Sequence, residues 1–136
     1  MPHATAIPVV CALIENREGR VLMAQRPPHK HLGLKWEFPG GKIEPGEAAE
    51  AALHREIREE LGCAIDILRA LPRTTHAYEK VTIEMIPFVA RLAEGSPDPQ
   101  SHEHVALRWV EPSALATLDL PAADGPIIAA YLAPRA

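Results

Sequence analysis

The sequence predicts an α/β fold of the α+β type, in which a mixed β-sheet is sandwiched between flanking α-helices. Two observations predict it: strand-like apolar segments lie on both sides of a central helical segment, and turn residues separate them. This order of strands, loop, helix, strands and C-terminal helices is typical of such a sandwich. With 136 residues, the chain is expected to form a single domain, residues 1–136, because it is too short for two.

Strands are predicted where an apolar run of strand length ends at turn residues or at a polar loop. The first two are joined by "REG", in which Gly19 supplies the turn. In the longest, "VTIEMIPFVARL", apolar residues alternate from Val81 to Met85. The predicted strands are residues 7–16, 19–26, 64–71, 73–80, 81–92 and 105–110.

The central helix is expected from about Glu47 to Leu61. Leu53, Ile57 and Leu61 recur every four positions, which is the spacing of one helix face, and Gly62 is a natural stop. A short helix is expected at "EPSALATL" and a terminal helix at "GPIIAAYLA", which has a proline near its first turn.

The remaining segments are predicted as loops. Residues 27–35 and 93–104 are polar. Residues 36–47, "WEFPGGKIEPGE", contain two prolines and three glycines, so the backbone geometry of this loop is expected to be demanding.

Composition and charge exclude several classes of function. No apolar run approaches the roughly 20 residues of a membrane span and the N-terminus has no signal-peptide pattern, so a cytoplasmic protein without a membrane partner is expected. The net charge of −4 argues against a nucleic-acid polymer as partner but allows a single nucleotide carried with a metal ion. Cys11 and Cys63 are expected to be buried free thiols, and the His102-x-His104 pattern is too weak to indicate zinc.

Acidic residues are concentrated in the segment from Gly40 to Gly62, which holds six glutamates. Glu56, Glu59 and Glu60 share one face of the predicted helix, where like charges repel and the helix dipole is also negative. A solvated helix surface is the simplest interpretation of such a run. The alternative is a site of hard oxygen ligands, suited to Mg²⁺ or Mn²⁺.

The spacing around these glutamates decides between the two interpretations. After Gly41 come five residues, then Glu47, then seven residues, then "REIREELGC" over residues 55–63. This pattern resembles the signature of the Nudix hydrolases, G-x5-E-x7-R-E-U-x-E-E-x-G-U, in which U is aliphatic. Only Cys63, at the last position, departs from it, and Cys is also small and apolar. The resemblance implies the Nudix fold.

The resemblance covers nearly the whole chain. The segments "AQRP", "WEFPGGKIEPGE", "HEHVALRWV" and "LPAADGPII" are similar to the MutT branch of that family. That branch implies hydrolysis of a nucleoside triphosphate to the monophosphate and pyrophosphate, with Mg²⁺ as cofactor and Mn²⁺ as a substitute. Its best-known substrate, 8-oxo-dGTP, is a mutagenic precursor for DNA replication, so the implied role is sanitation of the nucleotide pool, which belongs to DNA repair.

Several alternatives stay open at this point. The nearest is the same chemistry on an oxidised or methylated CTP or dCTP. ADP-ribose and dinucleoside polyphosphates fit the flanking motifs less well. A non-catalytic domain that senses a nucleotide is the alternative from another class, although such domains typically lose the carboxylates of the motif. The oligomeric state, monomer or homodimer, is also open.

The resemblance implies roles for the carboxylates one by one. Glu56, Glu59 and Glu60 are implied as catalytic metal ligands, together with the Gly40 carbonyl group. Glu103 is implied as a further metal ligand or as a general base, with a solvated loop acid as the alternative. A negatively charged protein needs such cations to bind a polyanionic triphosphate.

Four charged residues are implied to support the reaction. Glu47 and Arg55 resemble the scaffold pair that braces the loop against the helix, with a plain exposed ion pair as the alternative. Lys42 and Arg26 are expected to neutralise phosphate charge, and Lys42 could equally be a surface lysine. Glu47, Arg55 and Lys42 are counted with the catalytic residues and Arg26 with the substrate-binding residues.

The base of the nucleotide is expected to contact three further residues. His31 lies on a loop that approaches the nucleotide in this branch, and Phe38 is expected to line the base pocket, whereas Trp36 and Trp109 are expected to pack. Asp124 stands where the "PPAN" segment of the family has Asn, and is expected to read the base. An acceptor there suits the guanine N1–H, the N7–H of 8-oxoguanine or the cytosine amino group. The alternative is that Asp124 caps the final helix.

Overall fold

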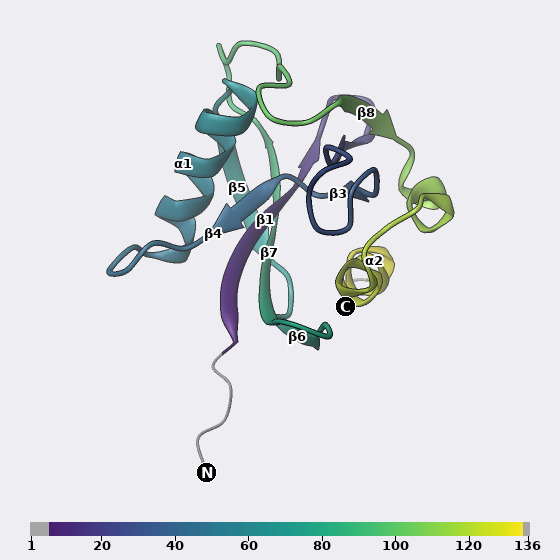
Figure 1. The fold of residues 1–136 in the computed structure, drawn as a ribbon. Helices are drawn as coiled ribbons and strands as arrows, with labels where there is room; N and C mark the ends of the chain where they lie inside the picture. The colour runs from purple at the N-terminus through teal and green to yellow at the C-terminus, as the bar shows by residue number, and fades with distance from the viewer. Residues whose placement is uncertain (1–5, 135–136) are drawn as a thin grey trace.

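The computed structural model describes residues 6–134 and confirms the predicted fold class (Figure 1). Within this range, a mixed sheet of eight strands lies between helix α1 (Ala49–Leu61) and helix α2 (Gly125–Leu132). Two 3₁₀ helices, η1 (Pro112–Thr117) and η2 (Ala122–Asp124), precede α2. The strands are β1 (Ile7–Glu15), β2 (Val21–Gln25), β3 (Trp36–Glu37), β4 (Gly40–Lys42), β5 (Ile65–Ala70), β6 (Thr74–Ala77), β7 (Thr82–Leu92) and β8 (Ala106–Val110).

A long parallel pair of strands forms the centre of the sheet. β1 runs parallel to β7, from Ile7 opposite Ile83 to Glu15 opposite Arg91, and the strand order is β3-β2-β1-β7-β5. The other pairings within residues 6–134 are antiparallel, and they join β8 to β2, β6 to β7 and β4 to β1. Because both faces of this centre are covered, its strands are apolar at successive positions rather than at alternate ones.

Side chains of β1 contribute alternately to two separate cores. Successive side chains of a strand point to opposite faces, so Val10 packs with Ile57 of α1, whereas Leu13 packs with Ile127 of α2. All four are fully buried, and each such aliphatic side chain contributes about 1.5–3 kcal/mol of hydrophobic stabilisation. The two helices therefore cover opposite faces of the sheet, α1 on the left and α2 on the right of Figure 1.

One edge of β1 is shared by two different strands. Glu15 pairs with β2, whereas residues 9–11 pair with β4, and between them the Ala12 N–H donates to the Pro39 carbonyl at 2.9 Å. Gly40 approaches β1 so closely that a Cβ there would lie 1.9 Å from the Val10 carbonyl oxygen. Glycine is therefore required, and the segment that leads into α1 is held at the middle of the sheet.

Two predictions about elements were wrong in part. Residues 36–47 are not a loop throughout, because β3 pairs with β2 and β4 pairs with β1. Helix α1 begins at Ala49 rather than Glu47, because residues 44–47 form a turn in which the Glu47 N–H donates to the Glu44 carbonyl. The segment after β8 is the 3₁₀ helix η1. The other predicted elements are confirmed with small differences at their ends.

Both cysteines are free and buried, as predicted. Burial raises the pKa of both thiols, that of Cys63 to about 11, so neither is a reactive thiolate at neutral pH. Helices long and apolar enough to cross a membrane are absent from the part of the chain that the structure describes.

Candidate active site

The carboxylates of α1 lie beside its apolar face but differ in exposure. Leu53 and Ile57 point into the core, and the glutamates occupy the neighbouring face. Glu60 is only 7% exposed and Glu56 is half-buried, whereas the side chain of Glu59 is 57% exposed. The three predicted ligands therefore do not have the same environment.

Glu60 is the most perturbed carboxyl group of the helix. Burial, and to a smaller extent the negative charges of Glu56, Glu37 and Glu103, raise its pKa to about 8, and the Gly40 backbone N–H opposes the rise. One of its oxygens, Oε2, is buried without a hydrogen-bond partner among the described residues. A carboxyl group in such surroundings gains strongly from a nearby cation.

Glu56 packs directly against the glycine pair of β4. A Cβ at Gly41 would lie 2.4 Å from Glu56 Oε2, so glycine is required for the carboxylate to occupy this position. Burial raises the pKa of Glu56, and the Arg55 guanidinium opposes that rise. The close approach brings the Glu56 carboxylate to the edge of the strand that carries Gly40.

Arg55 braces the loop before α1 against the helix. Its Nε donates to Glu47 Oε2 at 2.7 Å and its Nη2 to Oε1 at 2.9 Å, and both side chains are only 17% exposed. The Arg55 guanidinium lowers the pKa of Glu47 to about 2, and Nη2 also donates to the Lys42 carbonyl at 3.2 Å. The pair is thus partly buried and bidentate, and the alternative of a plain exposed ion pair is wrong.

The predicted metal ligands are not assembled into a closed site. Arg55 Nη1 lies 2.8 Å from Glu56 Oε1 and 3.3 Å from Glu59 Oε2, so a guanidinium group supplies positive charge between them. Across residues 6–134, no three His, Cys, Asp or Glu side chains are grouped closely enough to hold a metal ion as they stand. Their chemistry nevertheless fits a hard divalent cation, because the donors are carboxylate oxygens and Glu60 Oε2 has no hydrogen-bond partner within the described range.

Glu103 lies at the rim of this carboxylate group. Its side chain is exposed, it lines a small cleft together with Glu60, and its charge raises the pKa of both Glu60 and Glu56. Glu103 is therefore an exposed loop acid that shares a cleft with Glu60 and whose charge acts on the helix carboxylates.

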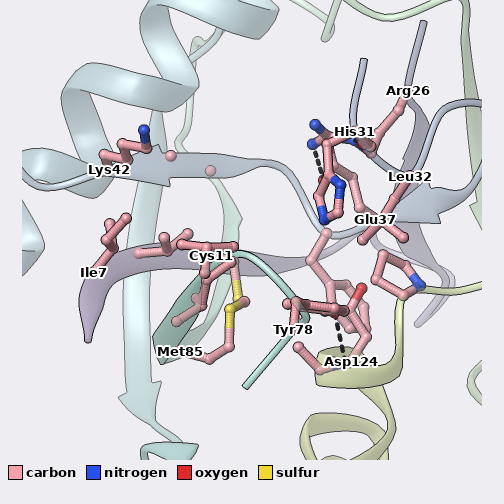
Figure 2. A pocket seen from close by; sticks show the side chains of 18 of the residues that line it. Ile7, Cys11, Arg26, His31, Leu32, Glu37, Lys42, Tyr78, Met85 and Asp124 are labelled. Carbon is pink, nitrogen blue, oxygen red and sulfur yellow. Dashed lines mark hydrogen bonds and ion pairs between the residues drawn. The ribbon is translucent and has the colours of Figure 1, made fainter. Parts of the chain in front are cut away.

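A cavity of about 530 Å³ adjoins the carboxylates, and its volume is within the range of small-molecule sites. Figure 2 shows Arg26, His31 and Glu37 at one end, Lys42 of β4 at the other, and Tyr78 and Asp124 below the first group. The cavity brings together these sequence-predicted residues: Arg26, His31, Phe38, Gly40, Lys42, Glu60 and Asp124. The two tryptophans are partly buried and pack against the cores, as predicted.

Asp124 lies in the cavity wall as a nearly buried acid. It is 4% exposed, and its Oδ2 has no hydrogen-bond partner among the described residues. It stands at the N-cap position of α2, but its side chain makes no capping hydrogen bond, which contradicts the capping alternative. Burial, and to a smaller extent the charge of Glu37, raise its pKa to about 8, and Arg26 opposes the rise. At neutral pH this carboxyl is mostly protonated, so it offers both a donor and an acceptor.

Two residues of the site, Glu37 and Tyr78, were not predicted from the sequence. Glu37 accepts from Arg26 Nη1 at 2.9 Å and pairs with His104 Nε2 at 3.0 Å. Tyr78 lines the cavity, and its hydroxyl accepts from the Ala123 N–H at 3.0 Å. Arg26, predicted to bind phosphate, is thus engaged inside the protein.

A signal for Glu37 was present in the sequence. In "WEF" it is a charged residue between two aromatic ones, which is the alternation of a strand with one polar face. Tyr78 had no such signal, because it follows a different strand, and only the fold brings it to His31, with ring centroids 5.6 Å apart.

Comparison with known proteins identifies the family. The NUDIX domain model matches residues 10–130 of the chain. The protein belongs to the Nudix family. A CTP pyrophosphohydrolase of Escherichia coli (strain K12) is 40% identical over 130 residues, which cover 96% of this chain and 94% of that protein. An 8-oxo-dGTP diphosphatase of the same strain is 29% identical over 121 residues, which cover 89% and 92%.

Solved structures have the same architecture as this Nudix protein. The solution structure of the E. coli ORF135 protein matches with a TM-score of 0.81 and 34% identity, over 97% of this chain and 94% of that one. The crystal structure of a MutT protein from Methanosarcina mazei Go1 also has a TM-score of 0.81, over 95% and 94% of the chains. At 24% identity, it supports the fold alone. This Nudix hydrolase is thus a nucleotide pyrophosphohydrolase, and enzymes of its family generally use divalent metal ions.

Proposed function

We propose that this Nudix hydrolase uses Mg²⁺, or Mn²⁺ as a substitute, to hydrolyse a nucleoside triphosphate to the monophosphate and pyrophosphate, and that it prefers a cytosine base. The observation that carries this proposal is the pair of carboxyl groups, Asp124 and Glu37, that share one cavity beside the carboxylates of α1. The resemblance to the MutT branch favours 8-oxo-dGTP, whereas this pair of acids favours cytosine.

Cytosine fits the two acids because its exocyclic amino group carries two N–H donors. A protonated Asp124 can donate to N3 of cytosine and accept one amino hydrogen, while Glu37 accepts the second. Uracil has a carbonyl oxygen in place of the amino group, and Glu37 would then face an acceptor. The 40% identity to a CTP pyrophosphohydrolase supports the same base.

8-oxo-dGTP is the second candidate, and Asp124 is also the observation that favours it. A protonated carboxyl is complementary to the O6 acceptor and the neighbouring N7–H donor of 8-oxoguanine. Relatives named 8-oxo-dGTP diphosphatase, such as the one of Haemophilus influenzae at 33% identity over 90% of this chain, support this candidate too. Hydrolysis of that substrate would serve sanitation of the nucleotide pool.

The phosphate end of the substrate is assigned to the carboxylates of α1. Glu56, Glu59, Glu60 and the Gly40 carbonyl would hold the divalent cation, which neutralises phosphate charge and activates water when bound. We assign Glu103 as a further ligand or as the acceptor of a proton from the attacking water, because it shares the cleft of Glu60. Lys42, exposed at the end of the cavity opposite Arg26, is assigned to phosphate contact.

Pyrophosphate release from a panel of nucleoside triphosphates tests the proposal. With Mg²⁺ present, kcat/KM is expected to be highest for CTP or dCTP, lower for 8-oxo-dGTP and lowest for UTP. A strong preference for 8-oxo-dGTP over every cytosine nucleotide would favour the second candidate instead, and no release from any of them would refute both.

The bond that is cleaved can be tested separately in ¹⁸O-labelled water. We expect water to attack the β-phosphorus and the nucleoside monophosphate to leave, so the label should enter pyrophosphate. Label in the monophosphate would mean attack at the α-phosphorus and would contradict the assigned position of the triphosphate.

A further inference from the structure

The polar loop between β7 and β8 is fixed to the C-terminal end of α1. The last carbonyl groups of a helix have no partners within it, and this loop supplies them. The Gln100 N–H donates to the Leu61 carbonyl at 2.8 Å and the His102 N–H to the Glu60 carbonyl at 3.1 Å. The His102 ring adds Nδ1, 3.0 Å from the Glu59 carbonyl oxygen. Because a carbonyl only accepts, Nδ1 of His102 carries the hydrogen.

Two residues further on, the side chain of His104 contacts Glu37 of β3 instead of α1. Its side chain is 4% exposed, and its Nε2 lies 3.0 Å from Glu37 Oε2. The second oxygen of Glu37, Oε1, accepts from Arg26 Nη1 at 2.9 Å. The carboxylate is therefore held at both oxygens by residues from two different segments of the chain.

We propose that His104 is a positioning residue that holds Glu37 at the cavity and so sets the base preference of the enzyme. The inference rests on the proposed function, since it takes Glu37 as a contact of the base. It also divides the His-x-His motif into two roles: His102 anchors the loop on α1, and His104 orients Glu37.

The geometry explains why one hydrogen bond would matter for selectivity. Without the bond from His104, Arg26 is the one remaining side-chain partner of Glu37 among residues 6–134, and its guanidinium can bind both oxygens of a carboxylate side by side. Such a bidentate pair would turn Oε2 away from the base. A charge-assisted hydrogen bond is about twice as strong as a neutral one, so its loss is expected to reduce base preference by about fivefold to tenfold.

Variants of the two histidines test this inference. His104→Phe keeps a buried ring without the donor, His104→Gln keeps an N–H donor, and His102→Ala is the matched control in the same loop. The readouts are kcat/KM for CTP and UTP, and the Kd ratio of CMP to UMP measured without metal. We expect both ratios to fall by about fivefold to tenfold in His104→Phe, to recover in His104→Gln, and to stay within about twofold in His102→Ala.

A second measurement separates orientation of Glu37 from packing. Glu37→Gln should show the same loss of preference, and combining it with His104→Phe should add little, because both changes break one interaction. In ¹⁵N NMR spectra of the wild type, Nε2 of His104 should carry the hydrogen, and its signal should shift in Glu37→Gln.

Three outcomes would overturn the inference. In the first, base preference survives in His104→Phe but is lost in Glu37→Gln. In the second, His104→Phe and His104→Gln lose preference equally and Tm falls in parallel, which is the pattern of a packing defect. In the third, the wild type has no base preference, and that result would refute the proposed function as well.

Discussion

Glu60 and Asp124 are buried carboxyl groups with similar ionisation but different neighbours. Burial is the largest cause of the shift at both, and both have a pKa of about 8 and one oxygen without a hydrogen-bond partner among the described residues. Around Glu60, the charged neighbours that raise its pKa are three other carboxylates. Around Asp124 there is one such carboxylate, one opposing guanidinium and the aromatic wall of the cavity.

This difference in neighbours indicates different ligands for the two acids. A group of like charges around Glu60 is relieved by a cation, so ionised Glu60 suits a divalent metal. Asp124 has the positive charge of Arg26 nearby and apolar side chains around it. It therefore suits a neutral ligand, to which a protonated acid can donate one hydrogen bond and from which it can accept another. Two carboxyl groups with the same pKa are thus assigned different roles, and the charges of their neighbours distinguish the two roles.

The largest expected effect comes from removing the charge of Glu60. In the presence of Mg²⁺, Glu60→Gln should lower kcat by at least about 10²-fold, because the carboxylate is assigned to the cation that activates water. Without metal, its Tm should be unchanged or slightly higher, because repulsion among the carboxylates is relieved. Pyrophosphate release and thermal melting measure the two effects.

Glu50→Gln is the matched control, since Glu50 is exposed in the first turn of the same helix. It should retain the wild-type kcat. Near-normal rates in Glu56→Gln, Glu59→Gln and Glu60→Gln alike would show that these carboxylates do not carry the reaction.

A smaller and more selective effect is expected at Asp124. Asp124→Ala should lower kcat/KM for the preferred triphosphate, CTP or 8-oxo-dGTP, by about tenfold or more, as the loss of one or two hydrogen bonds implies. Activity on a non-preferred triphosphate such as UTP or dGTP should change much less. Equal losses on all substrates together with a lower Tm would mean that Asp124 only supports the fold.

The helix half of the site could be predicted from the sequence because its residues lie in one short segment. Glu56, Glu59 and Glu60 share a face through helical spacing alone, and the required glycines stand just before the helix. The sequence could not show that Arg55 bridges Glu56 and Glu59, because this depends on how each side chain turns once the loop has folded over the helix.

The cavity half could be predicted only in part, because its residues are distant in the chain. Asp124 and Phe38 were found by resemblance, whereas Tyr78 reaches the cavity only because β6 pairs with β7 near η2. His104 was considered only as a zinc ligand, and its partner Glu37 lies 67 positions away. The topology of the mixed sheet brings such distant residues together, and no local sequence pattern encodes that topology.

Addition of metal should separate the two acids by their effect on stability. Mg²⁺ at ten times its Kd should stabilise the wild type by about 1.4 kcal/mol, or roughly 3–6 °C in Tm. The shift should disappear in Glu60→Gln and persist in Asp124→Asn, because of these two acids Glu60 is the one assigned to the cation. Removal of the metal with EDTA should reverse it. A shift that persists in Glu60→Gln would place the cation elsewhere.

The last expected effect is on the pH dependence of stability, and comparison of the wild type with Asp124→Asn isolates the part that Asp124 contributes. Its pKa is about 8 in the folded protein against an ordinary value of 3.8, so between these values the folded state binds a proton that the unfolded state has released. The contribution of Asp124 to the free energy of unfolding is therefore fully present below about pH 4 and is lost as the pH rises to about 8. Asn resembles the protonated acid and does not titrate.

Asp124→Asn should accordingly melt at about the wild-type temperature near pH 4 and at least several degrees higher than the wild type near pH 8.5. Melting curves of the metal-free proteins across this range measure the difference. Metal is left out because the pKa of Glu60 is also about 8, so metal binding would change over the same pH range. Parallel curves for the two proteins would show that Asp124 has an ordinary pKa. The protonated acid assigned to read the base would then have to be replaced by an ionised one, which favours two N–H donors on the ligand over a donor and an acceptor.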